Sequence, residues 1–145
     1  MAKIKVYKLL DDSEDDFLLI GIATTMKEYK ISFELNRILA TEFEKKDNLL
    51  FENKERGRTM SFGILMGENE MKDVRYFIFN NRNLGENLLP QLSDYDYLLK
   101  IEGHAFSLQL SDVLEKLKAL PEVIICAEIP QDKVKQASRL RTDHL

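Results

Sequence analysis

The stretch "VRYFIFNNRNLGENLLPQLSDYDYLLKIE", residues 74–102, decides the fold because it places two strand signals on either side of a polar loop. Residues 74–80 are rich in β-branched and aromatic side chains, which predicts a central strand covered on both faces. A second strand is expected over about residues 95–102. Asp94 and Asp96 stand where this strand begins, although aspartate is depleted in strands. The pair therefore needs an explanation.

Further strand signals lie on both sides of this stretch. Residues 4–9 alternate between apolar and polar, and residues 17–24 form a short apolar run that is typical of a buried strand. Residues 49–53 lead into a turn where Gly57 can supply the positive φ of a hairpin. The strand after this turn is expected to share one face among Met60, Phe62, Ile64 and Met66.

Two helices are predicted from apolar side chains spaced three and four residues apart. Thr25 and Glu28 have the spacing of a capping box, so the first helix should run over about residues 26–40. The second ends at Pro121. The apolar stripes of the two helices are Ile31, Leu35, Ile38 and Leu39, and then Leu110, Val113, Leu114, Leu117 and Leu120.

The end of the chain predicts one more strand and a short helix. Residues 123–129 are apolar, and a strand, a helix and a strand in succession favour a right-handed parallel crossover. Pro130 then opens a short, basic C-terminal helix, because proline is tolerated in a first turn. Together these signals predict an α+β fold: a mixed, mostly antiparallel sheet of about five to seven strands with two main helices packed on it.

The composition describes one ordinary globular domain. The chain has 145 residues, of which 44% are hydrophobic and 32% charged, and no linker divides it, so we expect a single domain over residues 1–145. The net charge of −4 argues against general binding of nucleic acid. No run is apolar enough to cross a membrane, the first residues lack the apolar core of a signal peptide, and the single Cys126 fits a reducing cytosol.

The turn before the second central strand resembles a known signature. Leu89, Pro90 and Gln91, followed after three residues by Tyr95, Asp96 and Tyr97, are similar to the motif of the bacterial IPExxxVDY family. The segments "LIGIATTMKEYKISFELNRIL" and "FNNRN" extend the likeness. The resemblance implies a cytosolic bacterial protein of unknown function. Pro90, Asp96 and Tyr97 match the motif outright, whereas Leu89, Gln91 and Tyr95 depart from it.

The departure at Gln91 limits what the motif can do chemically. An amide cannot replace a glutamate that acts as a general acid or base. Either this position is structural, or this member of the family is inactive.

Asp94 and Asp96 are the first candidate site. On one strand face their Cα atoms would be roughly 6.5–7 Å apart, a spacing that suits a general acid and base or two ligands of a hard cation. Alternatively, Asp94 ends a turn, and Asp96 accepts backbone N–H groups of the neighbouring loop or pairs with Arg82. Tyr97 is expected on the opposite, core-facing side with Tyr95, Leu99 and Ile101.

The loop that contains Asn80, Asn81, Arg82 and Asn83 is the second candidate. It carries side-chain amides and a guanidinium beside a central strand, where a rigid scaffold can present a binding loop. Alternatively, it is a turn built from asparagines that tolerate a left-handed conformation.

Metal and cofactor sites are not expected. The acidic run "DDSEDD" at residues 11–16 lacks the glycine and glutamate of an EF-hand, so a solvated loop explains it. His104, His144 and Cys126 have no zinc-ligand spacing. Cys126 lies in an apolar run, where a cysteine usually behaves as a small buried hydrophobe.

We therefore expect a non-enzymatic binding or protein-interaction module that self-associates, most simply as a homodimer. A further protein partner, not identified by the sequence, is an additional expectation. The alternative is a small enzyme that uses Asp94 or Asp96 with Tyr97 and Arg82. A weaker alternative is an accessory factor that contacts RNA or an acidic partner through its basic tail. The tail residues are Lys133, Lys135, Arg139 and Arg141.

Overall fold

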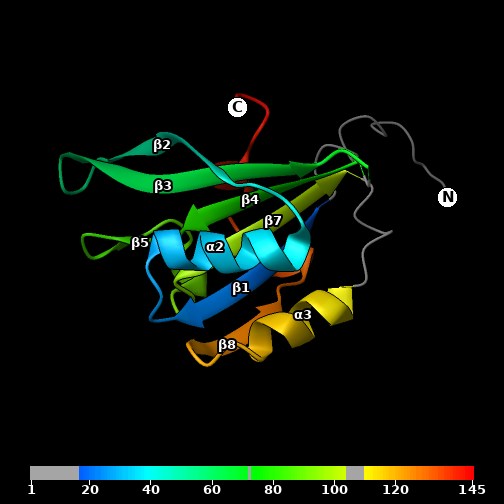
Figure 1. Ribbon diagram of the computed structural model, residues 1–145. Helices are drawn as coiled ribbons and strands as arrows, with labels where there is room; N and C mark the ends of the chain where they lie inside the picture. The colour runs from blue at the N-terminus through cyan, green and yellow to red at the C-terminus, as the bar shows by residue number, and fades with distance from the viewer. Residues whose placement is uncertain (1–16, 72, 104–109) are drawn as a thin grey trace, which may run out of the picture.

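A six-stranded antiparallel sheet with two helices forms the body of the protein (Figure 1). The computed structural model describes residues 17–71, 73–103 and 110–145. The strands lie in the order β2-β3-β4-β7-β1-β8. The α+β class is therefore confirmed. The strands are β1 (Leu18–Thr24), β2 (Glu44–Asn53), β3 (Arg58–Asn69), β4 (Val74–Asn80), β7 (Tyr97–Gly103) and β8 (Val123–Glu128). The strand predicted over residues 4–9, the acidic run and His104 lie outside the described residues.

The predicted central strand is confirmed. β4 pairs with β3 on one side and with β7 on the other, and Tyr76, Phe77, Ile78 and Phe79 are all buried. The hairpin between β2 and β3 is also confirmed, with Gly57 at a φ of 63°. Residues that carry a side chain rarely adopt a positive φ, which explains why a glycine stands at this position.

The predicted parallel crossover is wrong in one respect. β8 does not pair with β7; it pairs with β1, which itself pairs with β7, and both ladders are antiparallel. β7 and β8 therefore run in the same direction with β1 between them. The reason lies in β1, in which every residue after Leu18 is buried, so that it needs a neighbour on each side.

Two helices cover one face of the sheet, which we call the helix face. α2 (Glu28–Leu39) and α3 (Leu110–Lys118) pack their predicted stripes onto it. The predicted capping box is wrong, because Lys27 is the N-cap and makes no side-chain capping bond. Glu28 instead accepts hydrogen bonds from Asn80 Nδ2 (2.5 Å) and Lys45 Nζ (3.1 Å).

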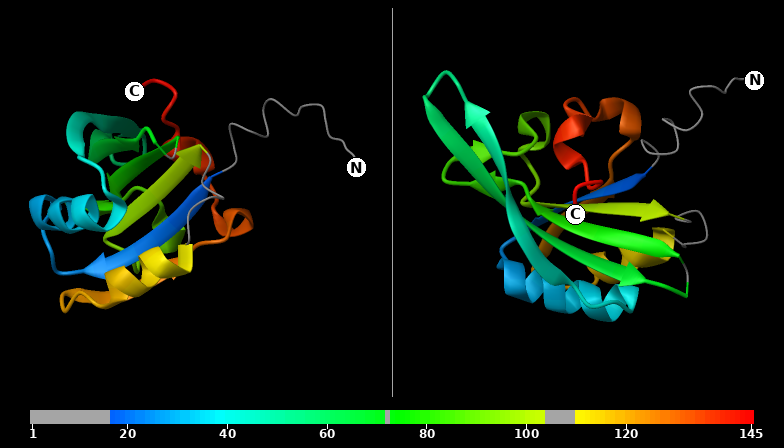
Figure 2. Two further views of the ribbon diagram at one scale, coloured as in Figure 1. Left: turned by 45° about the vertical axis from the view of Figure 1, so that its right-hand side comes forward. Right: turned by 90° about the horizontal axis from the view of Figure 1, so that it is seen from above.

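The other face, which we call the loop face, is covered by irregular chain (Figure 2). The covering segments are residues 88–95 of the β4–β7 connection and residues 129–140 at the end of the chain. The predicted C-terminal helix is wrong: two short 3₁₀ turns, Gln131–Lys133 and Ala137–Leu140, take its place. The fully buried Leu140 anchors this segment on the sheet.

Candidate functional site

The connection between β4 and β7 holds most of the predicted site residues. It begins with a small hairpin of β5 (Arg82–Asn83) and β6 (Glu86–Asn87), followed by a 3₁₀ turn at Pro90–Leu92. The two residues at the hairpin tip, Leu84 and Gly85, have φ angles of 52° and 81°. Positive φ at both positions is the geometry of a type I′ turn.

Asn81 holds this connection together. Its side chain is fully buried, and its Nδ2 donates to the backbone oxygens of Leu92 and Tyr95 at 2.9 Å each. Its Oδ1 accepts the N–H of Leu89, also at 2.9 Å. All its hydrogen-bonding groups are therefore used inside the protein, and Asn81 organises the loop rather than presenting a group to a ligand.

Asp96 links the same loop to β1. Its Oδ2 accepts the N–H of Thr24 at 2.8 Å, its Oδ1 lies 3.4 Å from Arg82 NH1, and its own N–H donates to Ile22 O at 2.9 Å. Its side chain is 28% exposed. The interpretation of Asp96 as a structural residue predicted this ion pair with Arg82. It also predicted that Asp96 accepts an N–H of the asparagine loop, whereas the N–H that it accepts is that of Thr24 in β1.

The two aspartates do not share a strand face, because β7 begins only at Tyr97. Asp94 is exposed in the turn that follows the 3₁₀ helix. Tyr95 packs against the core of the loop face rather than that of the helix face, and its ring lies over Gly21. A Cβ atom on Gly21 would be 2.6 Å from Tyr95 Cγ, so this ring position requires a glycine beneath it. The prediction that Tyr95 lies on the same side as Tyr97 is therefore wrong, because Tyr97 belongs to the core of the helix face.

The remaining candidates point to different places. Tyr97 is buried on the helix face, and its hydroxyl donates to Met26 O at 2.8 Å. Burial, with smaller effects from Glu28 and Asp96, raises the pKa of Tyr97 to about 12. Asn83 donates from its side chain to Ser61 O at 2.6 Å. Tyr97 and Asn83 therefore each form a hydrogen bond that connects two segments of the protein.

The signature-like segment also holds the C-terminal chain. Gln91 Nε2 donates to Lys135 O at 2.8 Å, and Arg139 NH1 donates to Leu88 O at 2.8 Å. Lys100 is buried, and its ammonium group donates to Leu140 O and pairs with Glu102 Oε2, both at 2.8 Å. In the structure, the amide at position 91 thus has a structural contact.

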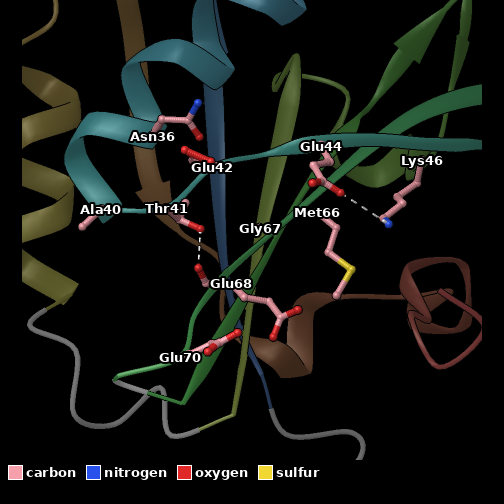
Figure 3. Close-up of a pocket in the computed structure, with 10 residues that line it drawn as sticks. All are labelled: Asn36, Ala40, Thr41, Glu42, Glu44, Lys46, Met66, Gly67, Glu68 and Glu70. Atoms are coloured by element: carbon pink, nitrogen blue, oxygen red, sulfur yellow. Dashed lines mark hydrogen bonds and ion pairs between the residues drawn. The ribbon is translucent and has the colours of Figure 1, made fainter.

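An acidic hollow lies beside the C-terminal end of α2 and is also lined by the start of β2 and the end of β3 (Figure 3). Its volume is about 550 Å³. Lys46 lies 4.0 Å from Glu44, and Thr41 Oγ1 donates to Glu68 O at 2.6 Å. Within the described chain, no group of three or more His, Cys, Asp or Glu could hold a metal ion. The carboxylates on the wall are those of Glu42, Glu44, Glu68 and Glu70, and none of the predicted site residues is among its lining residues.

The two edges of the sheet differ strongly in chemistry. β2 begins with the charged residues 44–47 and has an irregular register between Lys46 and Leu49, both of which protect an edge against pairing. β8 is apolar, and its Ile124 and Ile125 are 67% and 50% exposed. The sequence predicted a strand here without indicating that it forms an edge of the sheet, so the exposure of these residues was not predicted.

Cys126 is buried in β8, as predicted. Burial raises the pKa of its thiol to about 11, and the nearby Lys118 opposes the rise only in part. The thiol is therefore protonated at neutral pH and is a poor nucleophile.

Comparison of the sequence with models of protein families gives no match, and comparison with curated proteins also gives none. In the described part of the chain, no helix is long and apolar enough to cross a membrane. The resemblance to the IPExxxVDY family stays a prediction.

Proposed function

We propose that this chain is a non-enzymatic protein-interaction module that self-associates through the outer edge of β8. The exposed Ile124 and Ile125 on this strand are the observation that carries the proposal. An apolar edge offers unpaired backbone groups as well as apolar surface to another strand. The resemblance to a bacterial family supports a cytosolic setting for this activity.

The contacts of the predicted catalytic groups favour a non-enzymatic module over the small enzyme that was the alternative. Asp96 binds a backbone N–H and a guanidinium, and the hydroxyl of Tyr97 donates to a buried carbonyl. A catalytic pair would instead direct these groups into a shared concave site. The accessory-factor alternative gains little from Arg139, which already donates to Leu88 O and stacks 5.4 Å from the centre of the Phe51 ring.

The oligomeric state as a function of concentration tests the proposal. Sedimentation velocity of the full chain is expected to show a reversible monomer–dimer equilibrium. Ile125→Lys should shift it to monomer, because a lysine on the edge opposes pairing. Leu50→Lys is the matched control, since Leu50 is 65% exposed on the opposite edge strand β2. A wild-type chain that stays monomeric at every concentration would refute the proposal, as would equal loss of dimer in both variants.

A further inference from the structure

The backbone of β8 determines which groups can reach a partner. Ile129 N–H donates to Leu19 O at 2.8 Å. Because antiparallel pairing alternates with a period of two, Ala127 and Ile125 also direct their N–H and C=O groups toward β1. The backbone groups of Cys126 and Glu128 therefore point to the outer edge.

This edge is bounded at both ends. The register between β1 and β8 skips Ile124, so this residue forms a bulge that interrupts regular pairing. At the other end, Pro130 has no N–H to donate. The regular outer edge is thus limited to residues 125–129.

We infer that the partner is a second copy of this chain, whose β8 pairs antiparallel with the first around a two-fold axis at Ala127; this inference rests on the proposed function. In this register Cys126 lies opposite Glu128 of the second copy, and Glu128 lies opposite its Cys126. Both outward residues of each copy then form hydrogen-bonded pairs. The two sheets become one continuous sheet with α3 of each copy on the same side.

The neighbouring registers are less favourable. An axis at Cys126 would pair Glu128 with the bulged Ile124, and an axis at Glu128 would place two like charges directly opposite each other. The second of these would also pair Cys126 with Pro130, which lacks the required N–H. The axis at Ala127 also places a small side chain where the two strands approach most closely.

Charge complementarity supports the same register. Lys118 is exposed at the end of α3, which packs against β8 on the face that buries Cys126. Its ammonium group lowers the pKa of the Cys126 thiol, in agreement with this position. Glu128 is exposed and would stand opposite Cys126 in the second copy. Each Lys118 therefore faces a Glu128 of the other copy, which gives two symmetric ion pairs. Ile125 would meanwhile be covered by Ile129 of the second copy.

Charge reversal tests this register. Glu128→Lys and Lys118→Glu should each weaken the dimer about tenfold, because each removes two attractions and creates two repulsions. The double variant should recover wild-type affinity to within about threefold. Lys54→Glu and Glu55→Lys are the controls, since these exposed residues lie in the β2–β3 turn and change the net charge equally. If the double variant is as weak as the product of the single effects, the ion pairs do not exist.

A disulfide gives an independent measurement. In the Ala127→Cys/Cys126→Ser variant the two cysteines would lie opposite each other, about 4.5 Å apart at their Cα atoms, and diamide should link the dimer. The Ile125→Cys/Cys126→Ser variant should not be linked, because each new cysteine would lie opposite Ile129 of the second copy and far from the other cysteine. A reversible wild-type dimer that shows neither the charge recovery nor the Ala127→Cys link would overturn this register while leaving self-association intact. A monomeric wild type would instead refute the proposed function itself.

Discussion

The two faces of the sheet are sealed by different means. On the helix face, α2 and α3 present regular apolar stripes, and their own backbone groups are satisfied within the helices. On the loop face, irregular chain is held by single polar side chains such as those of Asn81, Gln91 and Lys100, which bind backbone oxygens. The cover of the helix face therefore depends on a repeated sequence pattern, whereas the cover of the loop face depends on a few individual side chains.

Among the variants that test these two covers, loss of the Asn81 side chain should cause the largest loss of stability. Asn81→Ala leaves two partly buried carbonyl oxygens and one buried N–H without their partner, so we expect a loss of about 3 kcal/mol in the free energy of unfolding. Urea denaturation measures this loss. Asn83→Ala is the control, because Asn83 is exposed and should cost less than about 1 kcal/mol. Equal losses in the two variants would contradict the central role of Asn81.

Lys100→Met should have the next largest effect. Leu140 O loses its donor and Glu102 loses one of its partners, while the methionine fills most of the space, so a loss of about 2 kcal/mol is expected. Hydrogen exchange should increase first in residues 139–142, since the lysine fastens that segment to β7. Lys116→Met, which removes an exposed pair with Asp112, should leave this exchange unchanged. Uniform faster exchange over the whole sheet would show that the segment is not held separately.

The fold was predicted where it depends on periodicity. The helical stripes, the central strand at residues 74–80 and the glycine turn at Gly57 each follow from local sequence, and each is confirmed. The position of β8 beside β1 was not predicted, because strand order depends on how whole elements pack rather than on any local pattern. The capping box failed because the helix begins at Glu28 with Lys27 as its N-cap, so that Glu28 is the first helical residue and not the third. Its carboxylate contacts Lys45 and Asn80 instead.

The candidate site was predicted less well. The sequence placed Asp96, Arg82 and the asparagines in one region, and the ion pair between Asp96 and Arg82 is present. It could not show that Asn81 is buried while Asn83 is exposed, because neighbouring residues of one type carry no signal of their direction. The exposed edge of β8 was missed because an apolar run gives the same pattern in a buried strand and in an exposed one.

Tyr97→Phe tests the helix face at a smaller scale. The variant loses the hydrogen bond to Met26 O, which should cost about 1 kcal/mol near neutral pH. The pKa of Tyr97 in the folded protein, about 12, lies above its ordinary value of 10.0, so its stabilising contribution is present below pH 10 and is lost as the pH rises toward 12. Stability curves measured by urea denaturation should therefore converge at high pH. Parallel curves would show that folding does not raise the pKa of this hydroxyl.

The smallest expected effect concerns the tip of the β5–β6 hairpin. Leu84 is 85% exposed and has a positive φ, a conformation that asparagine tolerates better than leucine. Leu84→Asn should therefore stabilise the protein by about 0.5–1 kcal/mol, measured by thermal or urea unfolding. Met71→Asn is the control, since Met71 is 98% exposed but is not among the residues with positive φ. If both substitutions are neutral, the hairpin tip carries no strain, and the loop face would be irregular in shape without being strained at this turn.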